Sequence, residues 1–176
     1  KLFDYQPLPK GRNIGIISNT GGAGVLATDT ASKLGLNIAK MSKETQQELR
    51  QVLPPIASIN NPIDVVASGG RREYRIATEL MLKDSNMDML LVICAVPTFA
   101  GMTQTEHAAG TLEGVRIAET KKPVVGVWLA GDVGKPGKDL LEMNKIPCYD
   151  DPALATLCMD CIAEYGFVAG SVNCNA

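Results

Sequence analysis

The chain has 176 residues, of which 45% are hydrophobic and 20% charged, and its formal net charge at pH 7 is −2. This length suits one domain with a proper core, and the scattered charges form no basic stripe that would favour nucleic acid. The longest apolar run, residues 89–97, is too short to span a bilayer, and the polar, proline-broken start resembles no signal peptide. We therefore expect a cytoplasmic protein that binds neither nucleic acid nor membrane.

The first predicted strand is Asn13–Ser18, which is rich in isoleucine. Residues 1–11, which contain two prolines, are interpreted as an incoming linker and residues 171–176 as a frayed tail. The domain is therefore expected to cover residues 12–170. A loop of small residues, Ser18–Gly24, connects the strand to a predicted helix over residues 23–34.

The junction between this strand and this helix is a candidate anion site. Backbone N–H groups at a helix start have no intrahelical partner, and the peptide dipoles add partial positive charge there. The loop matches neither G-x-G-x-x-G nor the Walker pattern, because no Gly-Lys-Ser/Thr follows it. Glycines also allow tight turns and let a helix pack close to a sheet. Taken alone, the loop leaves an anion site and a structural turn equally open.

The next segments are a short strand over residues 37–40 and a helix that Ser42 can cap, ending before Pro54. Residues 54–70 then show no periodicity and contain the sequence Asn-Asn-Pro-Ile-Asp over residues 60–64. An irregular segment of this length is long for a compact domain, and such loops are often functional.

The rest of the chain alternates between helices and strands. Helices are predicted over residues 72–83, 105–120, 138–143 and 152–165, and strands over residues 89–96, 124–129 and 147–149. This pattern predicts an α/β, flavodoxin-like (Rossmann-like) fold: a five-stranded parallel sheet in the order 2-1-3-4-5 with helices on both faces. Ligands of such sheets bind where the strand order reverses, so the loops over residues 18–24 and 97–103 are expected to flank a crevice.

Few side chains suggest catalysis by themselves. His107 is the only histidine and titrates near neutrality when unperturbed, so catalysis is one interpretation, but a solvated surface histidine is favoured. Asp64 could be an acid, a base or a metal ligand, yet a hydrogen bond to its own loop is favoured. Arg71 and Arg72 could clamp a phosphate, although exposed charges at a helix start fit them better. Trp128 is expected in the core.

The five cysteines are odd in number, which favours a reducing compartment over disulfides. Cys158 and Cys161 form a C-x-x-C, which could be a redox pair or half a zinc site. No second such pair exists, however, and only one histidine is available. Packing in a buried helix is favoured, and no metal site is predicted. The proposed buried face consists of Leu154, Leu157, Cys158, Cys161, Ile162 and Tyr165.

Residues 18–29, SNTGGAGVLATD, resemble the glycine-rich loop of the NDP-forming acyl-CoA synthetases, the succinyl-CoA synthetase superfamily. The similarity covers residues 10–168. It includes Leu-Gly-Leu at 34–36, Ser-Lys-Glu-Thr at 42–45, Leu-Pro-Pro at 53–55, Asn-Pro-Ile-Asp at 61–64 and Lys-Pro-Val at 122–124.

The resemblance implies one flavodoxin-like module of an ADP-forming acyl-CoA synthetase, or acetate–CoA ligase. Such enzymes convert acyl-CoA, ADP and phosphate reversibly into acid, CoA and ATP through a phosphorylated histidine. The parent enzyme would use CoA, ATP or ADP, phosphate and Mg²⁺, and its CoA-binding, phosphohistidine and ATP-grasp domains would be the partners of this one. The resemblance further implies that helix N-termini from two domains hold the phosphate.

Carried over by position, the phosphate-binding residues are Asn19, Thr20, Gly21, Gly22, Ala23 and Gly24. Asn61, Pro62 and Asp64 match a second motif of the family.

This sequence also departs from the family. The Ser-His-Thr-Gly segment of the phosphohistidine is absent, His107 stands in Glu-His-Ala, and no ATP-grasp domain is present. Ala23 and Asn60 stand where a proline and a glycine are expected. We therefore expect no complete ligase activity from this chain alone and no cofactor bound by it alone. One alternative is a non-catalytic regulatory or CoA-sensing module, as in acetyltransferase fusions, and another is a free-standing flavodoxin-like binding protein.

Overall fold

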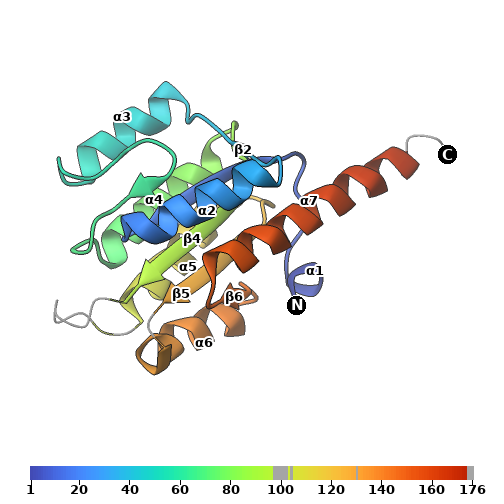
Figure 1. The fold of residues 1–176 in the computed structure, drawn as a ribbon. Coiled ribbons are helices and arrows are strands. Elements are labelled where there is room, and N and C mark those ends of the chain that lie inside the picture. The colour runs from blue at the N-terminus through green and yellow to red at the C-terminus, as the bar shows by residue number, and fades with distance from the viewer. Residues whose placement is uncertain (97–102, 104, 130, 174–176) are drawn as a thin grey trace.

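In a computed structural model, which describes residues 1–96, 103, 105–129 and 131–173, the strands form one parallel sheet with helices on both faces (Figure 1). The order is β2-β1-β4-β5-β6, and β3 pairs with β1. The strands are β1 Asn13–Ser18, β2 Asn37–Ile38, β3 Ile63–Asp64, β4 Met89–Ala95, β5 Val124–Leu129 and β6 Cys148–Tyr149.

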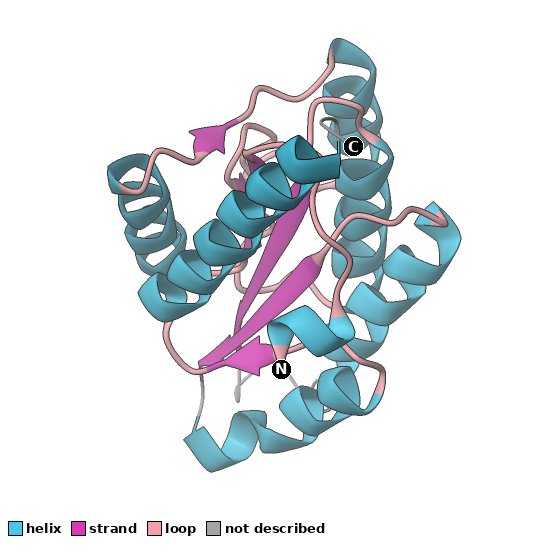
Figure 2. Cartoon of the chain, turned by 90° about the vertical axis from the view of Figure 1, so that its right-hand side faces the viewer, coloured by secondary structure: helices cyan, strands magenta, loops and turns pink. Residues whose placement is uncertain are grey.

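Helices alternate with these strands and lie on either side of the sheet (Figure 2). Apolar residues of α2 and α7 pack on one face, and those of α3, α4, α5 and α6 pack on the other, which gives two core layers. The helices are α1 Leu2–Tyr5, α2 Gly21–Lys33, α3 Lys43–Val52, α4 Arg71–Lys83, α5 Glu106–Ala118, α6 Lys135–Met143 and α7 Pro152–Asn173, with a 3₁₀ turn at Gly131–Gly134.

The predicted α/β class and the parallel sheet covered on both faces are confirmed. The predicted count and order of five strands, 2-1-3-4-5, need correction, because β3 adds a sixth strand beside β1. This strand lies in the segment that was expected to be irregular. Two residues are too few to show the alternation by which strands are recognised in a sequence.

Asn61 explains how β2 and β3 can both lie beside β1. Strand β2 pairs with β1 only at Asn13 and Ile14, and β3 joins it at Ile17 and Ser18. In the gap, the Asn61 amide donates to the carbonyl oxygens of Ile14, at 2.8 Å, and Ala39, at 2.9 Å. Its Oδ1 accepts from the Ile16 N–H at 2.9 Å. The side chain thus continues the hydrogen-bond ladder where no strand backbone is present.

The two ends of the chain pack on the domain. Residues 1–11, expected as a linker, contain α1, whose Leu2 is buried in the core layer that includes α7. The Gln6 side chain donates to the Lys145 carbonyl oxygen at 2.6 Å and accepts from the Val124 N–H at 2.7 Å. Helix α7 continues through residue 173, into the range expected as a tail.

Helix α7 turns a different face to the sheet than its sequence pattern predicts. Of the six residues proposed as its buried face, only Ile162 is fully buried, whereas Leu154, Leu157 and Tyr165 are exposed. The residues on the sheet are Ala155, Met159, Ile162 and Ala163. The prediction was wrong because α7 is apolar on both sides, so periodicity could not say which side faces the sheet.

The same apolar character makes α7 the one candidate membrane span among the residues that the structure describes, over Pro152–Ala169. Length and composition alone are weak support for a membrane span, since the core helix of a globular domain can be equally long and apolar.

Candidate anion-binding site

The loop after β1 is fixed to the sheet by its own first residues. Ser18 and Asn19 are both buried. Ser18 Oγ accepts from the Thr20 N–H at 3.1 Å and donates to the Thr20 carbonyl oxygen at 2.8 Å. The Asn19 side chain reaches β4, where it accepts from the Ala95 N–H at 2.8 Å and donates to the Ala95 carbonyl oxygen at 2.9 Å. Asn19 therefore ties the loop that follows β1 to the neighbouring strand β4.

Helix α2 begins without a side-chain cap. Thr20 precedes it in an extended conformation, and its hydroxyl makes no capping hydrogen bond. Within the described parts of the chain, no hydrogen bond from the N–H groups of Gly21, Gly22 or Ala23 is found. A Cβ atom added at Gly22 would have no atom within 4 Å, so the space in front of the helix is open. Unpartnered donors at an open helix start are suited to an anion.

The second motif lies beside this helix start. A Cβ atom at Gly24 would lie 3.9 Å from Pro62 Cβ, and one at Gly21 would lie 4.0 Å from Asp64 Oδ2. Asp64 Oδ1 accepts from the Val66 N–H at 2.9 Å, which confirms the predicted hydrogen bond of Asp64 to its own loop. The structure thus brings together two motifs that are about forty residues apart in the sequence.

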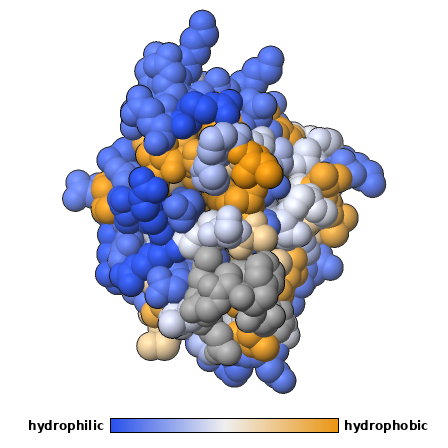
Figure 3. All heavy atoms as spheres, turned by 90° about the vertical axis from the view of Figure 1, so that its left-hand side faces the viewer, coloured by the Kyte–Doolittle hydropathy of each residue, from blue (hydrophilic) through white to orange (hydrophobic). Residues whose placement is uncertain are grey.

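The side of the molecule that faces the viewer in Figure 3 has a surface of near-neutral hydropathy between hydrophilic and hydrophobic areas. The loop over residues 97–103, predicted to flank the crevice, lies outside the described residues except for Thr103.

His107 is fully buried, so its interpretation as a solvated surface residue was wrong. Its ring packs edge-on against Tyr74 with 5.0 Å between ring centroids, and its Nε2 lies 3.0 Å from the Gly69 carbonyl oxygen. Burial lowers the pKa of His107, although the contact with Gly69 opposes the shift in part. Tyr74 in turn donates to the Ile93 carbonyl oxygen at 2.7 Å. This placement favours packing between α4 and α5 over catalysis.

The buried imidazole makes stability depend on pH. In the unfolded chain His107 takes up a proton near pH 6.5, whereas the folded chain resists protonation until a lower pH. The free energy of unfolding should therefore be highest above pH 6.5 and fall below it, by at most about 1.4 kcal/mol per pH unit. Urea unfolding at pH 7.5 and 5.5 measures this, and His107→Phe should lose less stability over that interval. Equal losses in the two proteins would contradict the prediction.

The remaining candidates have structural partners. Arg71 forms an ion pair with Glu113, and Arg72 is exposed, as was favoured for these charges at a helix start. Trp128 is in the core, as predicted. Asp151, which directly precedes α7, caps this helix: its Oδ1 accepts from the Leu154 N–H at 2.8 Å. Cys161 is exposed and Cys158 half-buried, and the described residues contain no group of three or more His, Cys, Asp or Glu side chains that could hold a metal ion.

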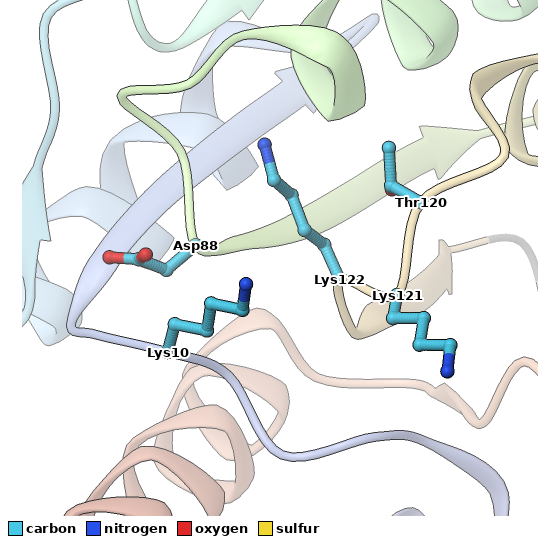
Figure 4. Close-up of a pocket in the computed structure, with 5 residues that line it drawn as sticks. All are labelled: Lys10, Asp88, Thr120, Lys121 and Lys122. Carbon is cyan, nitrogen blue, oxygen red and sulfur yellow. The ribbon is translucent and has the colours of Figure 1, made fainter.

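A cavity of about 180 Å³ lies where β1, β4 and β5 begin, at the end of these strands opposite to the glycine-rich loop (Figure 4). Lys122 is half-buried there, and its ammonium group donates to the Asp84 carbonyl oxygen at 2.6 Å. Burial lowers the pKa of Lys122. No sequence pattern predicts this cavity, because its lining residues come from separate segments of the chain. The lining residues are Lys10, Asp88, Thr120, Lys121 and Lys122.

A parallel sheet covered by helices on both faces, with a glycine-rich, uncapped helix start after its first strand, defines a doubly wound α/β domain. The model of the Ligase-CoA domain family matches residues 14–157. The chain belongs to this family.

Relatives and solved structures agree with this assignment. The chain is 44% identical over 169 residues to the alpha subunit of acetate–CoA ligase [ADP-forming] II from Pyrococcus furiosus, which covers 96% of this chain and 37% of the relative. It is 31% identical over 167 residues to acetate–CoA ligase [ADP-forming] from Methanocaldococcus jannaschii, covering 95% of this chain and 24% of that protein. The chain thus spans about a quarter to two-fifths of the length of these relatives.

Among solved structures, a protein from Pyrococcus horikoshii matches with a TM-score of 0.89 and 44% identity, over 91% of this chain and 37% of that one. An acetyl-coenzyme A synthetase from Candidatus Korarchaeum cryptofilum, in complex with phosphate and ADP, matches with a TM-score of 0.83 and 28% identity. That match covers 94% of this chain and 35% of the synthetase.

Proposed function

We propose that this chain is the domain of an ADP-forming acyl-CoA synthetase that cradles the phosphoryl group of a phosphohistidine carried by another domain. The observation that supports this most is the open, uncapped start of α2, held in place by Ser18 and Asn19. Family membership and the names of the relatives support the enzyme class.

The proposal gives the predicted site residues different tasks. The N–H groups of Gly21, Gly22 and Ala23 donate to the phosphoryl oxygens, and the uncapped Thr20 hydroxyl is free to turn towards them. Donors of this kind are already in place, so they stabilise the charge that develops during phosphoryl transfer and need not rearrange first. Asn19 and Gly24 hold the helix start at the correct distance from the sheet.

Asn61, Pro62 and Asp64 support the same structure from the side. Asn61 anchors the segment to β1, and Pro62 packs near Gly24. The Asp64 carboxylate accepts from the Val66 N–H and so holds its loop beside Gly21.

The parent enzyme would be cytoplasmic, would use CoA, ADP or ATP, phosphate and Mg²⁺, and would supply CoA-binding, phosphohistidine and ATP-grasp domains as partners. A non-catalytic regulatory module, as in an acetyltransferase fusion, is less well supported, because the relatives above are named as CoA ligases.

A charge placed at the helix start tests the proposal. In the complete synthetase, Gly22→Asp should lower the rate at which labelled phosphate from ATP appears on histidine by about a hundredfold, because the new carboxylate repels the phosphoryl group and competes with it for the N–H donors. The new carboxylate stabilises α2 through its dipole, so the melting temperature should not fall.

Gly22→Ala is the matched control, because it adds a Cβ atom into open space without charge. It should keep most of the phosphorylation rate. Equal rates for the aspartate and alanine variants would exclude a phosphoryl group at this helix start.

A further inference from the structure

Tyr74 of α4 is fully buried, and its hydroxyl group lies near the carboxyl end of β4, where it donates a hydrogen bond of 2.7 Å to the Ile93 carbonyl oxygen. Burial raises the pKa of Tyr74 well above its ordinary value, so the hydroxyl keeps its proton and remains a donor. A buried phenol that is already paired cannot touch a substrate. Any part that Tyr74 plays in the chemistry of this domain must therefore be indirect.

The side chain of Asn19, at the start of the glycine-rich loop, contacts the same end of β4. It accepts from the Ala95 N–H at 2.8 Å and donates to the Ala95 carbonyl oxygen at 2.9 Å. Cys94 lies between the two contacts, with its Sγ 4.0 Å from Asn19 Nδ2. Burial raises the pKa of Cys94 to about 12, and its interaction with the Tyr74 hydroxyl opposes this shift in part. The end of β4 thus connects Tyr74 with Asn19.

This end of β4 depends on side chains because the pairing with β1 stops there. Ser18 and Ile93 form the last pair of the two strands. Beyond it, the Asn19 side chain takes the place of a strand partner for Ala95. Tyr74 binds the carbonyl oxygen of the last paired residue of β4. The position of Ala95, and with it that of Asn19, therefore depends on the contact that Tyr74 makes.

The ring of Tyr74 leads to the second motif of the candidate site. It packs edge-on against His107, whose Nε2 lies 3.0 Å from the Gly69 carbonyl oxygen. Gly69 belongs to the segment that follows Asp64, the carboxylate near Gly21. Tyr74 therefore lies between the two segments that meet at the start of α2, and it is linked to each of them through one further residue.

We propose that Tyr74 is a positioning residue of the phosphoryl site, whose hydroxyl group holds the end of β4 and thereby, through Asn19, the start of α2. This role rests on the proposed function. Donors that stabilise a transition state must lie at the correct distance from it, and a displacement of about 1 Å caused by a distant residue can cost about a hundredfold in rate. Loss of one hydroxyl group behind the loop should cause a smaller displacement and a smaller loss.

The first experiment removes the hydroxyl group alone. In the complete synthetase, Tyr74→Phe keeps the ring against His107 and should lower the rate at which labelled phosphate from ATP appears on histidine by about tenfold, at a temperature where the protein is folded. Leu82→Ala is the control for lost stability, because Leu82 is equally buried on α4 but about 12 Å further along the helix. It should lower the melting temperature and keep the phosphorylation rate. Equal slowing in the two variants would overturn the proposal.

The second experiment tests whether Tyr74 acts through Asn19. Asn19→Ala removes both contacts with Ala95, so the end of β4 no longer holds the loop. Adding Tyr74→Phe to this variant should then slow phosphorylation by less than about twofold further, because residues that act in one chain of contacts are not additive. A lost hydrogen bond that only weakens the fold would not give this dependence. A further tenfold loss in the double variant would contradict the proposal.

Gly22→Asp distinguishes a wrong role for Tyr74 from a wrong function for the domain. If Gly22→Asp is slow and Tyr74→Phe phosphorylates at the wild-type rate, the phosphoryl site stands and only the role of Tyr74 is refuted. If Gly22→Asp itself keeps the full rate, no phosphoryl group lies at the start of α2, and both proposals are refuted together.

Discussion

Replacing Gly110 with valine is expected to lower the free energy of unfolding by about 3 kcal/mol or more. A Cβ atom at Gly110 would lie 2.2 Å from the Arg71 carbonyl oxygen and 3.0 Å from the Arg71 Cα. Gly114, one turn further along α5, meets the Arg75 carbonyl oxygen in the same way, at 2.5 Å. The obstacle is backbone and cannot move aside as a flexible side chain would. Valine therefore forces α5 away from α4 and opens the core layer between them.

The sign of this effect distinguishes packing from helix propensity. In an exposed helix, replacing glycine with another residue gains up to about 1 kcal/mol. Gly22→Ala provides that reference, since its new Cβ atom meets nothing within 4 Å. Urea unfolding followed by circular dichroism should show Gly110→Val well below the wild type and Gly22→Ala at or above it. A Gly110→Val protein as stable as the wild type would mean that the two helices are not in this close contact.

The sequence predicted those parts of the fold that depend on local patterns. Strands β4 and β5 are continuously apolar because both faces of the sheet are covered, and their bounds agree with prediction to within one residue. Ser42 was expected to cap α3, and its Oγ accepts from the Thr45 N–H at 3.1 Å. The expected end of α2 is marked by Gly35, which adopts a positive φ of 77°.

Features that depend on distant contacts could not be predicted in the same way. The burial of His107 comes from its contact with Tyr74, which lies on another helix. Leu154, Leu157 and Tyr165 of α7 are exposed although their spacing predicts burial, because apolar periodicity does not say which side of a helix packs on the sheet. The glycine loop was located as a candidate site, but its attachment to β4 through Asn19 joins residues 76 positions apart.

The second large effect is expected at Asn61, which should lower the free energy of unfolding by about 3 kcal/mol when replaced by leucine. Leucine is similar in size but makes no hydrogen bonds, so the Ile16 N–H and the carbonyl oxygens of Ile14 and Ala39 lose their partners. Each buried backbone group left unpaired costs about 1–3 kcal/mol, and partial access of water to this half-buried side chain reduces the total.

Asn60→Leu is the matched control, because it makes the same change one residue earlier at an exposed position. It should change the free energy of unfolding by no more than about 0.5 kcal/mol. Asn61→Asp separates the two kinds of hydrogen bond. The carboxylate keeps an acceptor for the Ile16 N–H, but it turns an oxygen towards two carbonyl groups that received donors before. It should therefore also be destabilising.

The Asn61 variants also connect stability to the candidate site. Asn61 holds the segment that places Pro62 near Gly24 and Asp64 near Gly21. In the complete synthetase, Asn61→Leu should therefore slow phosphorylation of the histidine even at temperatures where the protein is fully folded. A variant that is destabilised yet phosphorylates at the wild-type rate would limit Asn61 to a role in the sheet. Loss of both stability and phosphorylation rate would show that the hydrogen bonds of Asn61 between β2 and β3 also position the loop over residues 18–24.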